Sequence, residues 1–256
     1  MPVVDADFAI SWMRSRIDHQ FRVEILDQHL KQQQKANKDV IEAFSKSAPR
    51  PNAATRYFAD LLQPAFDFGR TVFLVTAHWG DYFQSLITLA AAFPDDSRFV
   101  TVRGMIWNDV DENKLWATLN GASNRHVEVF NQHDLKPIKL VREIVGGAHV
   151  FVLYDVDRSY GRPLVVDFFD VQLTLGAGWV DLAYRFDAIV VCLDPLTMFG
   201  DTMQLHSLYD ARKATNIEAF RDACASMISD HLQSLVSKQP TLWFKWPAFN
   251  RFLDVR

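Results

Sequence analysis

The sequence lacks any uninterrupted apolar run of the roughly 20 residues that a transmembrane helix needs. Its N-terminal stretch carries acidic residues too early, and too short an apolar run, for a secretory signal peptide. There are only two cysteines, Cys192 and Cys224, and their spacing fits neither a metal site nor a redox motif. These features predict a cytoplasmic protein with reduced thiols.

Several catalytic signatures are also missing. The sequence has no Gly-x-Ser-x-Gly elbow and no phosphate-binding P-loop, which argues against a serine hydrolase and a P-loop enzyme. Residues 175–178 resemble the start of a dinucleotide fingerprint, but Asp181 stands where its third glycine would be. The formal net charge of −4 gives no global attraction to nucleic acid, so we expect no nucleic-acid partner.

What is present is the composition of an ordinary globular domain. Hydrophobic residues make up 49% and charged residues 23% of the 256 positions, which allows a substantial core and argues against disorder. We expect a single domain over 1–256. Its parts are a helical N-terminal segment (1–50), an α/β core (70–210), and a closing helix with an aromatic tail (216–256).

Apolar runs alternate with amphipathic stretches from residue 71 onward. Strands are predicted at 71–77, 98–104, 126–131, 149–155, 163–169, 188–193 and 202–209. Helices are predicted at 5–46, 53–63, 81–93, 109–121, 135–147, 178–186 and 216–237. This alternation predicts an α/β fold, in which a mostly parallel central sheet carries helices on both faces.

His78 directly follows the apolar run Val72–Val75, where a buried parallel strand should end. Open α/β sheets bind ligands beyond the carboxyl ends of their strands, so this is a favourable position for a functional site. The next residues, from Asp81, have the spacing of a helix start. His78 is therefore either a general base or a histidine that hydrogen-bonds within a strand-to-helix turn.

The stretch TAHWGDYFQSLITLA resembles the active-site segment of the bacterial lipid A late acyltransferases, within the glycerolipid and lysophospholipid acyltransferase superfamily. His78, Trp79 and Gly80 match the family's His-x-x-x-x-Asp/Glu motif and its surroundings. A second block, 151–193, is similar throughout. The resemblance covers about residues 70–195, and it implies a glycerolipid-acyltransferase-like fold with His78 as general base.

The sequence departs from this family at one important position. Phe83 stands five residues after His78, where the family has the acid that orients the imidazole and stabilises its cation. Asp81 could take that role, although its other reading is a simple helix cap. Asp155 or Asp157 could serve instead, or His78 could act without a carboxylate.

Further residues are implied in substrate binding by the resemblance. Arg103 and Arg125 match arginines that bind anionic parts of donor or acceptor, with surface ion pairing as the alternative. Asp155, Asp157 and Gly176 lie at or next to positions that are typical of the family in the second block. Arg158, in the loop beyond Asp157, suggests a contact to phosphate. Asp155 and Asp157 lack an identifiable third ligand, so we expect no metal.

The resemblance implies an acyltransferase without a cofactor. An acyl thioester, on acyl carrier protein or coenzyme A, would donate to a hydroxyl or amine of a lipid, sugar or other small molecule. Backbone amides near Asp81, with Arg103, would stabilise the oxyanion. The alternative, motivated by Phe83, is a catalytically degenerate protein that binds acyl chains or acyl carrier protein.

The aromatic run 243–249 has two possible roles. It contains four tryptophan or phenylalanine side chains near basic residues, at Trp243, Phe244, Trp246 and Phe249. Such a run either packs as a C-terminal cover over the sheet or lies at a membrane interface. The second reading would make the protein peripheral at the inner membrane.

Overall fold

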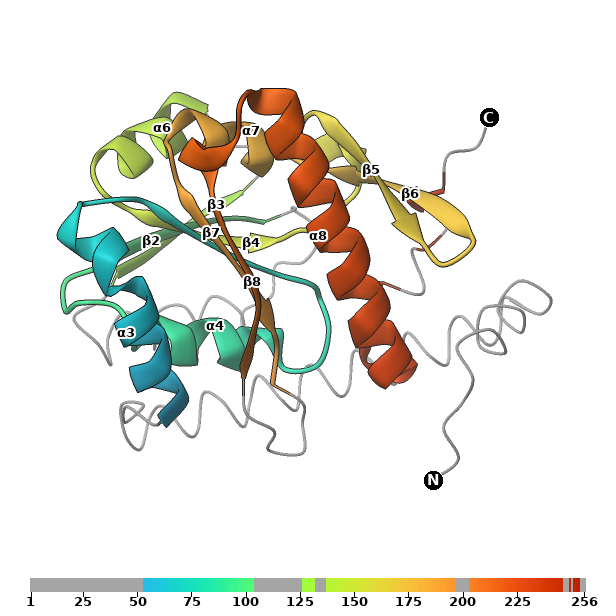
Figure 1. Cartoon of the computed structure of the whole chain (residues 1–256), viewed down its shortest axis with the longest axis horizontal. Coiled ribbons are helices and arrows are strands. Elements are labelled where there is room, and N and C mark those ends of the chain that lie inside the picture. The colour runs from blue at the N-terminus through green and yellow to red at the C-terminus, as the bar shows by residue number, and fades with distance from the viewer. Residues whose placement is uncertain are drawn as a thin grey trace.

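A computed structural model describes residues 53–103, 126–131, 137–196, 203–245, 249 and 251–253 (Figure 1). The helices predicted at 5–46 and 109–121 lie outside these residues. Within them the protein is an α/β structure built on a six-stranded sheet. The predicted fold class is therefore confirmed at this level.

The sheet has the order β3-β2-β4-β1-β7-β8. Its strands are β1 Val72–Thr76, β2 Arg98–Arg103, β3 His126–Asn131, β4 His149–Leu153, β7 Ile189–Asp194 and β8 Gln204–Asp210. All neighbours pair in parallel except β7 and β8, which are antiparallel. The sheet is thus mostly parallel, as predicted, with one antiparallel edge strand.

Helices cover both faces of this sheet. One side holds α3 Ala53–Asp67 and α4 Tyr82–Ala90, and the other holds α6 Pro137–Val145, α7 Gly178–Arg185 and α8 Ile217–Lys238 (Figure 1). The three central strands β4, β1 and β7 are buried on both sides because their side chains alternate between two cores. Phe73 and Val75 face the α6–α7–α8 core, while Val72 and Leu74 face the α3–α4 core. No helix among the described residues is long and apolar enough to cross a membrane.

A separate antiparallel hairpin, β5 Pro163–Phe168 and β6 Val171–Gly176, packs against α8. The sequence predicted β5 but not β6. The first strand alternates cleanly between exposed and buried positions, which is the pattern of a half-buried strand. The residues of β6 alternate between apolar (Val171, Leu173, Leu175) and polar (Gln172, Thr174) positions, so a strand pattern was present there although no strand was predicted.

The start of β4 carries a buried histidine. His149 is 8% exposed, lies among the rings of Phe66, Phe93 and Phe99, and accepts a hydrogen bond from the Val72 backbone N–H at Nδ1 (3.1 Å). Burial lowers the pKa of His149 to about 4. The folded protein therefore holds this imidazole neutral at pH values where the unfolded chain protonates it.

This burial predicts a loss of stability in mild acid. Because the pKa of His149 is lower in the folded than in the unfolded state, its contribution falls as the pH drops through 6.5 toward 4. His149→Asn keeps an acceptor for Val72 but does not titrate. The variant's stability deficit relative to wild type should shrink by about 2 kcal/mol between pH 7 and pH 5, measured by denaturant unfolding. A deficit that stays constant over this range would contradict the assignment.

Candidate active site

The register of two neighbouring strands brings His78 and Asp155 together. β1 and β4 are adjacent and parallel, with Thr76 opposite Leu153. His78 and Asp155 each lie two residues beyond these partners, at the carboxyl edge of the sheet. The strand-end location predicted for His78 is therefore where the structure has it.

The side chains of this pair are in direct contact. His78 Nδ1 lies 2.7 Å from Asp155 Oδ1, and the His78 backbone N–H donates to both carboxylate oxygens at 3.0 Å. Asp155 is fully buried, whereas 18% of the His78 side chain is exposed. When Nδ1–H donates to the carboxylate, the ring's lone pair resides on Nε2, which is the arrangement of a histidine base.

Residues 242–245 complete the surroundings of the carboxylate. The Trp243 indole N–H donates to Asp155 Oδ2 at 2.8 Å, and Trp243 is fully buried. This segment is also tied to the turn after β1, since Gly80 N–H donates to Leu242 O and Phe244 N–H donates to His78 O. At Trp243 the aromatic run is thus packed against the sheet edge, as expected if it covers the sheet and not a membrane surface at this residue.

The electrostatics of the carboxylate follow from these contacts. Burial raises the pKa of Asp155, but His78, Lys245 and the Trp243 hydrogen bond outweigh it and hold the pKa at about 2. Lys245 responds in the opposite sense. Burial lowers its pKa, and the negative charges of Asp155 and Asp157 only partly offset this effect. Asp155 is therefore an anion at neutral pH, and Lys245 lies close enough to interact with its charge.

Asp81 occupies the other position proposed for the supporting acid. Its carboxylate accepts a hydrogen bond from the Gln84 backbone N–H at 3.0 Å, which is the geometry of a helix N-cap for α4. Burial raises the pKa of Asp81, and the Gln84 hydrogen bond opposes that shift. Of the alternatives that the sequence left open, Asp155 is the carboxylate in contact with Nδ1, while Asp81 caps the helix.

The loop after Asp155 holds three more of the predicted residues. Asp157 accepts from the Ser159 backbone N–H and caps the short helix η1 Arg158–Tyr160, on which Arg158 is exposed. Gly176 lies against this loop, because a Cβ there would approach Asp157 O to 2.2 Å. Gly176 thus allows the loop to close on β6, a packing role that the sequence did not predict.

The remaining predicted residues are only partly described. Arg103 is the last residue of β2, so its backbone lies at the carboxyl edge of the sheet, and Arg125 is outside the described residues. Phe83 lies in α4. The contact between Asp155 and His78 shows that the absence of an acid at position 83 does not leave the imidazole without a carboxylate.

The amides expected to stabilise an oxyanion are already engaged. The N–H groups of Trp79, Gly80 and Asp81 donate to the carbonyls of Ala77, Leu242 and Leu196, respectively. A donated N–H is not available to a substrate oxygen in this conformation. The expectation that the amides at this turn form the oxyanion hole is therefore wrong for these three groups.

Two residues of the site were not predicted from the sequence to belong to it. Trp243 and Lys245 lie 88 and 90 positions after Asp155, and no local pattern links them to it. The usable signal was the run of tryptophan, phenylalanine and lysine that follows the long closing helix. It left a packed cover and a membrane-interface segment as alternatives, and it did not indicate which strand end such a cover would contact.

Ligand-type side chains also gather at a second place. Asp194, His206 and His231 have ligand atoms within 4.8 Å of one another. Among the described residues they form a group of side chains that could hold a metal ion. Asp155 and Asp157 are not part of it.

No model of a known protein family matches the chain, and no curated protein matches it.

The hydrogen bond from Trp243 to the buried carboxylate can be measured against a matched control. Trp179 is also buried, and among the described residues its indole N–H has no hydrogen-bond partner. Both Trp→Phe substitutions remove part of a buried ring, but only Trp243→Phe removes a donor to a charged group. We expect Trp243→Phe to cost about 2 kcal/mol more unfolding free energy than Trp179→Phe. Equal losses in urea unfolding would mean that the bond contributes no net stability.

Proposed function

We propose that the protein is an acyltransferase in which His78 is the general base and Asp155 its supporting acid. The donor is an acyl thioester, carried on acyl carrier protein or on coenzyme A. The acceptor is a hydroxyl or amine of a lipid, sugar or other small molecule. The observation that carries this proposal is the 2.7 Å contact between His78 Nδ1 and the fully buried Asp155 carboxylate.

Three further observations support the proposal. The pair lies beyond the carboxyl ends of parallel strands, where α/β proteins bind ligands. The His78 side chain is partly exposed, so a substrate can approach it. The sequence around His78 also resembles the active-site segment of the lipid A late acyltransferases.

The chemistry needs one base and no covalent enzyme intermediate. His78 Nε2 takes the proton of the acceptor as its oxygen or nitrogen attacks the thioester carbonyl carbon. Asp155 stabilises the imidazolium that forms and keeps the ring in the required orientation. When the tetrahedral intermediate collapses, the carbon–sulfur bond breaks and the departing thiolate receives the proton from His78.

Positive charge near the pair would assist the same reaction. Lys245 interacts with both Asp155 and Asp157, so its ammonium is part of the local field at this strand end. The Arg103 backbone ends a strand at the same edge. In this proposal one of these cations, in place of the turn amides, stabilises the oxyanion.

The base is tested by offering the protein a panel of acyl carrier protein and coenzyme A thioesters with candidate acceptors. Thiol release and acylated product are followed by mass spectrometry. His78→Ala should lower product formation by at least about 100-fold, the lower end of general-base contributions. Wild-type turnover by this variant would overturn the mechanism.

The supporting acid is tested with a matched pair of aspartate variants. Asp155→Asn should lower the rate by about 100-fold or more, because an amide cannot stabilise the imidazolium as a carboxylate does. Asp81→Asn should leave the rate unchanged, since asparagine caps a helix as well as aspartate does. Circular dichroism checks that both variants are folded. The opposite ranking of the two rates would identify Asp81 as the supporting acid.

The alternative is a degenerate protein that binds acyl chains or acyl carrier protein without turnover, which Phe83 in the place of the family's acid suggests. Native mass spectrometry of the purified chain separates the two functions. We expect thiol release in the presence of a suitable thioester and acceptor. A bound lipid or carrier protein, with no thiol release across the panel, would favour the degenerate binder.

A further inference from the structure

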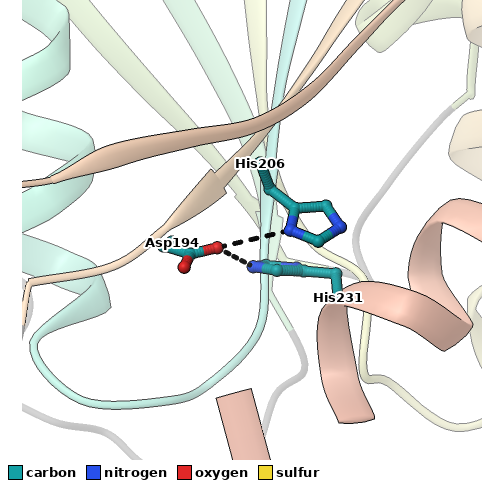
Figure 2. A group of neighbouring side chains, drawn as sticks. All are labelled: Asp194, His206 and His231. Carbon is teal, nitrogen blue, oxygen red and sulfur yellow. Dashed lines mark ion pairs between the residues drawn. The ribbon is translucent and has the colours of Figure 1, made fainter. Parts of the chain in front are cut away.

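A second group of polar side chains lies around the end of β7, and it is not used in the proposed acyl transfer. Asp194 is the last residue of β7, His206 lies in β8, and His231 lies in α8 (Figure 2). His231 is fully buried, and 22% of the His206 side chain is exposed. Two successive strands and the long helix after them thus bring two imidazoles to one carboxylate.

All three ligand atoms lie within 4.8 Å of one another, and the two distances to the Asp194 carboxylate suit a shared cation. Asp194 Oδ1 lies 3.2 Å from His231 Nε2 and 3.6 Å from His206 Nδ1 (Figure 2). Two ligand atoms of a tetrahedral zinc ion, each about 2.0–2.1 Å from the metal, are about 3.4 Å apart. The observed separations bracket that value.

Two of the atoms also lack another partner. Asp194 Oδ1 and His231 Nε2 are both buried and form an ion pair with one another when the ring is protonated, but within the described residues neither atom makes a well-directed hydrogen bond. Buried polar atoms are nearly always satisfied, so such a pair calls for an additional group. A cation between them would satisfy both atoms.

The opposite side of the His231 ring has the support that metal ligands usually have. His231 Nδ1 lies 2.9 Å from the Tyr154 hydroxyl, and Cys192 Sγ lies 3.2 Å from the same nitrogen. When Nε2 binds a metal, Nδ1 carries the proton and donates it to such a neighbour, which fixes the ring's orientation.

A backbone irregularity places the third ligand. The register of β7 and β8 shifts between Cys192, opposite Ser207, and Leu193, opposite Leu205, so His206 is the extra residue of a β-bulge. Bulges redirect side chains and are frequent near functional sites. Here the bulge brings the His206 ring to 4.6 Å from the ring of His231.

We propose that Asp194, His206 and His231 form a binding site for a divalent transition metal, with zinc the best match to this ligand set. Lys238 competes for the site, because its ammonium lies 2.5 Å from the other carboxylate oxygen of Asp194. The Lys238 side chain is half exposed and can move into solvent when the metal binds. The bound metal ties α8 to the β7–β8 edge of the sheet.

The test uses tag-free, full-length protein that has been treated with chelator and dialysed. Titration with Co²⁺ should give visible d–d absorption that saturates at one ion per chain, and Zn²⁺ should abolish it. Zinc at about 100 times its dissociation constant should raise Tm by about 5–10 °C. Neither readout depends on acyl transfer, so failure here leaves the proposed function untouched, and the reverse holds too.

Four variants define the site. His206→Ala should weaken binding by at least about 100-fold, and Tyr154→Phe by about tenfold, since it removes the group that orients His231. Lys238→Met should tighten binding by about two- to fivefold, because a competing surface charge is lost. His126→Ala, at an exposed histidine of β3, is the control and should bind like wild type.

Absence of the cobalt spectrum and of any zinc-dependent change in Tm would overturn the proposal. Binding that survives in His206→Ala, or that is lost in His126→Ala, would overturn it as well. If His206→Ala does not fold, Tyr154→Phe serves as the test, because it keeps the buried ring and should retain the fold. An unchanged affinity in this variant would then contradict the site.

Discussion

The buried carboxylate of Asp155 is the constraint around which this edge of the sheet is organised. An unpaired carboxylate in such a place would cost several kcal/mol, so every lone pair needs a donor. The donors come from the turn after β1, through the backbone and ring of His78, and from the indole of Trp243. Lys245 adds positive charge nearby. The charge therefore fixes the relative positions of β1, β4 and the segment after α8.

The mostly parallel sheet was predictable because its central strands are buried on both faces and so appear as continuous apolar runs, such as Val72–Val75. The helices between them carry one apolar face each. β8 was predicted as a strand, but its antiparallel direction depends on the β7–β8 pairing and not on its own residues. β6 was missed although its residues alternate between apolar and polar, whereas β5 was predicted from its run of apolar residues.

The candidate site was predictable only in part. His78 could be located because the end of a buried parallel strand is itself a local feature of the sequence. Its acid could not be chosen, because the choice depends on which strand lies next to β1 and in which register. Once β4 is that neighbour, with Thr76 opposite Leu153, Asp155 meets His78 and Asp81 is left to cap α4. Trp243 and Lys245 depend on the path of the chain after α8, which no short-range pattern specifies.

The bond between Trp243 and Asp155 has a consequence for biosynthesis. The indole that satisfies the carboxylate lies 88 residues later in the chain. At translation rates of about 5–20 residues per second, the ribosome needs about 4 to 18 seconds to add that length. During this interval β1 and β4 can already have emerged, while the acid between them still lacks one of its donors. A nascent chain would therefore hold the Asp155 carboxylate hydrated at first, and the strand edge would close only after residue 243 has emerged.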